Sequence, residues 1–186
     1  RFCEATWRSA DRVRFTVRHC FRQWMSSVDP LRRHLTLGTL SFGICFAAWG
    51  LISAFAVRFR ERFELSGTET ALLVAVPVLL GSLARLPMGI LADRFGARKV
   101  FSILIAVVSI PVFLVPQAGS YQALLVTAFF LGLAGSSFSV GVSYVSRWSP
   151  PAKQGGVLGV YGMGNIGQSA AVFLGPLLAA AIGWEQ

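Results

Sequence analysis

Residues 81–101, GSLARLPMGILADRFGARKVF, join the end of an apolar segment to a short basic turn. This stretch holds Arg85, which is the one charge inside any of the long apolar runs, and then a D-R-x-G-x-R-K cluster. An apolar run of about 20 residues is long enough for a helix to cross the hydrocarbon core of a bilayer. The stretch therefore predicts the end of a transmembrane helix and the turn that follows it.

Arg85 is the first candidate for a binding residue, because a charge at membrane depth is costly and usually faces a cavity or a substrate path. Gly81, Ser82 and Gly89 share its helical face and leave room beside a guanidinium. Pro87 is expected to bend the helix there. The alternative interpretation is a structural ion pair, but no Asp or Glu occurs in the other apolar runs.

The composition indicates an all-α membrane protein with several spans. Of the 186 residues, 54% are hydrophobic, and the mean hydropathy is +0.63. The net charge is +9, but eight of the 17 basic residues precede residue 35, which favours basic membrane flanks over a nucleic-acid partner. No phosphate loop, nucleophile–base pair or metal-like spacing of Cys, His and Asp is present. We therefore expect no enzyme, no cofactor and no metal.

The apolar runs divide the chain into a basic segment, residues 1–34, and a membrane domain, residues 35–186. Five spans are predicted, at about residues 35–57, 70–92, 100–116, 121–145 and 156–182. Basic residues favour the N-terminal segment and the connections after the second and fourth spans, so the N-terminus is predicted to be cytoplasmic. The arginines between the first two spans are the exception.

Two alternatives remain open for residues 1–24. Met25 precedes SSVDPLRRH and the first apolar run, which is typical of a membrane-protein start, so these residues are either not native or belong to a longer natural chain. In the second case, residues 7–24 are expected to form a basic amphipathic helix on the membrane surface.

Arg85, Phe138 and Asn165 are predicted to lie at one depth. At a rise of about 1.5 Å per residue, they lie roughly 12, 13 and 14 Å from the cytoplasmic ends of their helices. In a core about 30 Å thick, these depths are near the midplane, where secondary transporters bind substrate. The alternatives are that Phe138 packs or contacts lipid and that Asn165 joins helices by a hydrogen bond.

The fifth span begins with GGVLGVYGMGNIGQ, in which six glycines occur within thirteen residues. This density allows close approach of a neighbouring helix. Gly162, Asn165, Gln168 and Ser169 form a small and polar stripe on one helical face. Together with a guanidinium fork, such a stripe suits a planar or anionic ligand.

The turn after the second span resembles the loop motif of the major facilitator superfamily. The matching residues are Gly89, Asp93, Arg94, Gly96, Arg98 and Lys99. Ala97 stands where a basic residue is frequent. The resemblance implies the N-terminal five of twelve transmembrane helices and assigns the loop to the conformational cycle.

A finer resemblance is to the nitrate/nitrite porter family. Residues 162–168, GMGNIGQ, are similar to the family's glycine-rich signature, although a further glycine is usual where Gln168 stands. Residues 84–87, ARLP, and 135–138, GSSF, resemble its second-helix and fourth-helix segments. The resemblance implies that Arg85 binds the anion and that Phe138 stacks on it. It also implies that Asn165, Gly162, Gly164 and Gly167 complete the site.

The implied function is alternating-access transport of nitrate or nitrite across a bacterial inner membrane, by a protein that is a monomer when full length. The implied partners are the anion, the bilayer and a C-terminal half that is absent from this sequence. The alternatives are a superfamily porter for an organic anion or a drug, and a non-transporting sensor. The sequence does not distinguish nitrate from nitrite as the substrate, import from export, or proton symport from anion exchange. It also does not distinguish a natural truncation from a partial sequence.

Overall fold

The computed structural model describes the backbone of residues 10–182 and the side chains of residues 30–181. Every regular element among these residues is helical. In chain order they are α1 (Ala10–Ala54), α2 (Ala56–Arg62), α3 (Gly67–Phe95), α4 (Ala97–Leu114), η1 (Val115–Gln117), α5 (Tyr121–Leu131), η2 (Gly132–Ser136), α6 (Ser137–Ser146), η3 (Pro151–Lys153), α7 (Gln154–Gly162), η4 (Met163–Asn165) and α8 (Ile166–Ile182). The predicted all-α fold is confirmed.

Five helical segments are long and apolar enough to cross a membrane. They are Pro30–Ala54, Gly67–Phe95, Ala97–Gln117, Tyr121–Ser146 and Pro151–Ala181. The last two are not continuous α-helices, because the 3-10 segments η2 and η4 interrupt them. The two alternatives for residues 1–24, a non-native segment or a surface helix, fall on residues whose side chains lie outside the described part of the chain.

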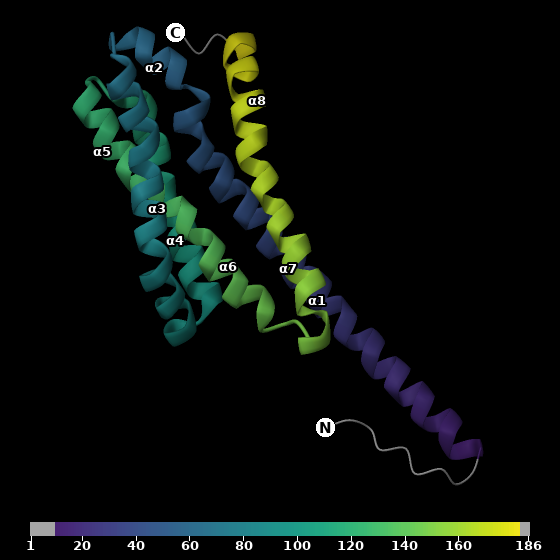
Figure 1. Cartoon of the computed structure of the whole chain (residues 1–186). Coiled ribbons are helices and arrows are strands. Elements are labelled where there is room, and N and C mark those ends of the chain that lie inside the picture. Colours follow the sequence, from purple (N-terminus) through teal and green to yellow (C-terminus); the bar gives the residue numbers. More distant parts are fainter. Residues whose placement is uncertain (1–9, 183–186) are drawn as a thin grey trace.

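The helices form two groups that meet along α1 and α6. Figure 1 shows α8 running alongside α1, whereas α3, α4 and α5 gather on the other side. α6 contacts α3 and α4 as well as α1 and α7. Among the described residues, α3 has no contact with the segment from η3 to α8. α6 therefore separates the helix that carries Arg85 from the glycine-rich helix.

Glycines set the distance between α3 and η2. A Cβ atom added to Gly81 would lie 2.8 Å from the carbonyl oxygen of Gly132, and one added to Gly135 would lie 3.3 Å from the Cα of Gly81. No larger residue fits between these two backbones without moving them. The close approach brings the backbone of the fourth span beside Arg85.

Large apolar side chains cover the outside of the helices. Leu86, Phe113 and Phe173 are each more than 70% exposed. In water such a surface would be an aggregation hazard, whereas in a bilayer it contacts acyl chains. With the five spans, this surface describes a multi-pass membrane protein.

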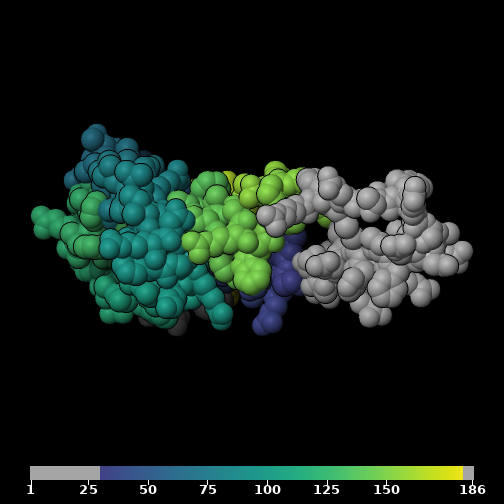
Figure 2. Space-filling model, turned by 90° about the horizontal axis from the view of Figure 1, so that it is seen from below, coloured from purple at the N-terminus to yellow at the C-terminus, as the bar shows by residue number. Residues whose placement is uncertain are grey.

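The turn between α3 and α4 consists of a single residue, Gly96. It ends α3, with its N–H bonded to the carbonyl of Ala92 at 3.1 Å, and it also precedes the first residue of α4. Its φ angle is +95°, in the region that L side chains rarely adopt. Figure 2 looks onto this end of the molecule, where the α3–α4 region in teal lies beside the end of α6 in green.

Gly96→Ala is expected to lower the stability of the protein by about 1–2 kcal/mol, because alanine disfavours positive φ. The measurement is the temperature at which half of the detergent-solubilised protein is lost from the monodisperse peak in size-exclusion chromatography. Gly119→Ala is the matched control: Gly119 also lies in a turn with open space around it, but without positive φ. Equal midpoints for the two variants would contradict the prediction.

Candidate functional site

Arg85 lies on α3 with its side chain exposed, and its guanidinium is held by the fourth span. Its Nε donates a hydrogen bond to the carbonyl oxygen of Gly135 at 3.4 Å. In return, Ser139 Oγ donates to the carbonyl of Arg85 at 3.1 Å. The Nε bond is the only one that the Arg85 side chain forms within the described residues, so its two terminal nitrogens stay available to a ligand.

Phe138 lies three residues after Gly135, at the start of α6, and is 41% exposed. Its ring centroid is 5.7 Å from that of Phe42 on α1 and 6.1 Å from that of Tyr161 on α7. Phe42 and Tyr161 are buried and stacked on each other, 4.8 Å apart. Phe138 is therefore supported by buried rings on one side while the rest of its ring stays accessible.

Tyr161 fixes the backbone at this point. Its hydroxyl donates to the carbonyl of Ser137 at 3.2 Å and lies 3.5 Å from the carbonyl of Phe138. Gly141 leaves the space for this hydroxyl, since a Cβ there would overlap it. The junction of η2 and α6, which carries Phe138, is thereby tied to α7.

The glycines of the fifth span divide into two sets. A Cβ on Gly164 would overlap the ring of Phe42, and one on Gly167 would overlap the carbonyl of Gly43, so these two glycines pack against α1. Gly162 has no atom within 4 Å of an added Cβ, and Asn165 is exposed. Packing and open positions therefore alternate along the same glycine-rich stretch.

The predicted polar stripe is only partly continuous in space. Ser169 is exposed like Asn165, but Gln168 packs against α1. Its Cγ lies 3.2 Å from the point that a Cβ atom added to Gly50 would occupy. The 3-10 segment η4 shifts the helical register at this point, because it has three residues per turn. A face predicted from a regular α-helix is therefore broken there.

The structure connects three of the six predicted site residues, Arg85, Phe138 and Gly164. Arg85 and Phe138 share the η2–α6 junction, and Phe138 reaches Gly164 through Phe42. Asn165, on the exposed side of η4, has no contact with α3 within the described residues.

The residues of the loop motif gather at one end of the bundle. Arg147 Nη2 donates to the backbone carbonyl of Asp93 at 3.3 Å, and the guanidinium of Arg94 lies 5.6 Å from the ring centroid of Phe95. Gly89 is half-buried on α3, and Lys99 is exposed on α4. The Asp93 carboxylate has no ion pair within the described part of the chain.

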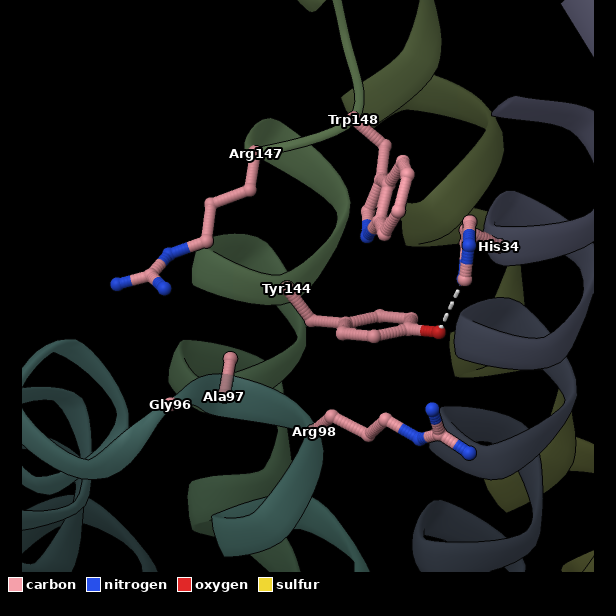
Figure 3. A pocket seen from close by; sticks show the side chains of 7 residues that line it. All are labelled: His34, Gly96, Ala97, Arg98, Tyr144, Arg147 and Trp148. Atoms are coloured by element: carbon pink, nitrogen blue, oxygen red, sulfur yellow. Dashed lines mark hydrogen bonds between the residues drawn. The ribbon is translucent and has the colours of Figure 1, made fainter. Parts of the chain in front are cut away.

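Sequence reasoning missed a contact group beside this loop. His34 stacks on Trp148 with ring centroids 3.7 Å apart. Its Nδ1 lies 2.6 Å from the hydroxyl of Tyr144. With Arg98 and Arg147, these three residues line a cavity of about 290 Å³ (Figure 3). No sequence signal links them, because His34 and Tyr144 are 110 positions apart.

Among residues 30–181, no group of His, Cys, Asp and Glu is placed to hold a metal ion. The chemistry that the site offers is therefore that of hydrogen-bond donors, one guanidinium and aromatic rings. Groups of this kind can bind and orient a small anion, and they are not nucleophiles or general bases.

Comparisons with known proteins identify a family of membrane transporters. A sequence model of the Major Facilitator Superfamily matches residues 37–186. The chain is 47% identical over 150 residues to a protein named probable nitrate/nitrite antiporter NarK1 of Thermus thermophilus, covering 81% of this chain and 34% of the relative.

Two further relatives have similar names. The nitrite extrusion protein of Bacillus subtilis is 41% identical over 156 residues, covering 83% of this chain and 40% of the relative. The probable nitrate transporter NarT of Staphylococcus carnosus is 38% identical over 151 residues, covering 81% and 39%. The chain thus spans between 34% and 40% of the length of these relatives.

Proposed function

The chain belongs to the major facilitator superfamily, and from this premise we propose that it is the N-terminal portion of a nitrate/nitrite transporter that works by alternating access. One observation carries the proposal. Arg85, the charge within an apolar span, is held by its Nε against Gly135, three residues from the accessible ring of Phe138. A guanidinium edge beside a flat ring suits a small planar anion.

Each residue of the proposed site has a separate task. Arg85 neutralises the anion and binds two of its oxygens through the terminal nitrogens. Phe138 packs on the flat face of the anion, and Tyr161 and Phe42 hold that ring in place. Gly162 and Asn165 contribute open space and an amide from the fifth span, on the side that closes onto the ligand.

Gly164 and Gly167 act through packing in this proposal. Their close approach to Phe42 and Gly43 fixes the fifth span on α1. That contact sets the position of Asn165, which lies between the two glycines in the chain. The signature would thus combine a packing function and a binding function in alternating residues.

The opposite wall of the site is assigned to a second half of the transporter. Alternating access in this class of transporter comes from the rocking of two bundles about a fixed midplane site. The loop motif at the α3–α4 turn is proposed to act as a latch between the halves. The Asp93 carboxylate, which has no ion pair within the described residues, is available there to an arginine or to a helix N-terminus of the second half.

We propose that the protein resides in a bacterial inner membrane with its N-terminus in the cytoplasm. The relatives named above are bacterial. The cavity lined by His34, Arg98 and Arg147 brings the first residues of the span Pro30–Ala54, the α3–α4 turn and the end of α6 together at one end of the bundle. This end carries most of the basic flanks, as the cytoplasmic end of membrane proteins does.

The test is uptake of nitrate and nitrite by the full-length protein in proteoliposomes. We expect flux of at least one of these anions above that of empty liposomes, and no flux from liposomes that hold residues 1–186 alone, because five helices supply one wall of the site. Movement of organic anions or drugs without nitrate or nitrite would favour the alternative porter. Anion binding without any flux would favour a sensor.

A further inference from the structure

Two adjoining cavities at the loop-motif end share Arg98 and Tyr144 in their linings. The first, of about 290 Å³, is the polar cavity that His34 and Trp148 also line. The second, of about 170 Å³, lies between α1 and α4 and is lined by Leu37, Phe101 and Ile105 together with the small polar residues Ser41 and Ser102. From this pair we propose a binding site for one anionic phospholipid, with its phosphate in the first cavity and an acyl chain in the second.

The polar cavity has a positive lining. Arg98 and Arg147 contribute to it, and no carboxylate of residues 30–181 does. Figure 3 shows the Arg98 side chain running beneath the Tyr144 ring toward α1, with Arg147 on the opposite side of Tyr144. The Arg98 guanidinium forms no hydrogen bond or ion pair within the described residues, whereas the Arg147 guanidinium donates to the carbonyl of Asp93. Arg98 is therefore the cation that is available to a phosphate.

The wall of this cavity is a fixed aromatic group. The stack of His34 on Trp148 and the short contact from His34 Nδ1 to Tyr144 Oη join α1 to the end of α6. Amphipathic aromatic side chains of this kind favour the depth of lipid headgroups. The wall is thus suited to the boundary between water and acyl chains.

The order of polar and apolar lining along α4 matches the long axis of a phospholipid. Arg98 lies in the first turn of α4, and Ile105 is seven residues farther, at about 1.5 Å per residue roughly 10 Å deeper. Leu37 of α1 faces the same groove and is 48% exposed. A phosphate at Arg98 would therefore direct its acyl chain along the groove toward the membrane interior.

A phospholipid explains both cavities together. Free phosphate or the transported anion needs only the polar cavity, and a further transmembrane helix needs only the apolar groove. Basic pockets between transmembrane helices are known to bind anionic headgroups. The proposal concerns lipid and holds whichever anion the protein transports.

The test measures lipid binding by native mass spectrometry of the full-length protein in detergent with added phosphatidylglycerol or phosphatidylcholine. We expect one tightly retained phosphatidylglycerol, and about fivefold weaker binding of it by Arg98→Gln, as follows from the loss of one basic group. Arg32→Gln is the matched control: Arg32 is an exposed arginine of α1 that lines neither cavity, so its loss is expected to change binding less than twofold.

Ser102→Trp tests the groove independently. Ser102 is exposed and lines the apolar cavity, so an indole there is expected to fill the acyl-chain space and reduce retention of phosphatidylglycerol at least fivefold. Retention equal to wild type in Ser102→Trp would overturn the proposal, and so would equal losses in Arg98→Gln and Arg32→Gln. Displacement of the lipid by millimolar inorganic phosphate or nitrate would assign the polar cavity to a free anion instead.

Discussion

Arg85→Lys in the full-length transporter is expected to reduce nitrate and nitrite uptake at least about tenfold. Lysine keeps the positive charge but loses the planar fork that binds two oxygens at once. The loss of one hydrogen bond to a charged group costs about 1.5–3 kcal/mol, or roughly ten- to 150-fold. The bond from Arg85 Nε to Gly135 disappears as well, so the lysine ammonium is no longer held beside Phe138.

The measurement is the initial rate of uptake into proteoliposomes with matched amounts of protein. Arg62→Lys makes the same chemical change at an exposed position of α2, far along the chain from the site, and is expected to transport like wild type. Wild-type rates in Arg85→Lys would make Arg85 a structural residue and move the binding site elsewhere. Absence of transport by the wild type would instead refute the substrate assignment.

The sequence allowed Arg85 to be singled out because a charge is conspicuous in an apolar run. The five spans were predictable for a similar reason, since length and hydropathy alone distinguish a membrane helix. The N-terminal part of the superfamily fold, five of twelve helices, was predicted from motifs in the right order, and the match over residues 37–186 confirms that family.

Hydropathy and motif spacing did not predict contacts between residues that are distant in the sequence. Tyr161 is buried, and the bond from its hydroxyl to the carbonyl of Ser137 connects two spans. His34 and Tyr144 meet only because α1 and α6 cross at one end of the bundle. Such pairs depend on three-dimensional crossing, and no local spacing records them.

The glycines of the fifth span show the same limit in another form. The number of glycines predicted a close approach of a neighbouring helix, which the structure has. It did not predict which glycines contact that helix. The positions at 155, 156, 159 and 162 face open space, whereas Gly164 and Gly167 meet α1. Which set packs depends on the side of the helix on which α1 lies, and the number of glycines does not record that.

Gly167→Ala is expected to have the largest effect on folding. The added Cβ would overlap the carbonyl oxygen of Gly43 and lie 2.9 Å from its Cα, and backbone atoms cannot move aside as a flexible side chain does. α8 would have to shift along its extensive contact with α1. We expect a loss of about 3 kcal/mol or more, at the upper end of overpacking effects.

Gly159→Ala separates this packing effect from the intrinsic effect of replacing a glycine in a helix. Gly159 lies on α7 with nothing within 4 Å of an added Cβ, so alanine there is expected to be neutral or to stabilise by up to about 1 kcal/mol through helix propensity. The measurement is the yield and thermal midpoint of the monodisperse protein in size-exclusion chromatography. If Gly167→Ala kept the midpoint of Gly159→Ala, α8 would not rest on Gly43, and the two glycines of the signature would have to act on the ligand instead. A collapse of Gly167→Ala beside an intact Gly159→Ala would mean that this part of the signature sets the spacing between α8 and α1, and with it the position of Asn165 in the proposed site.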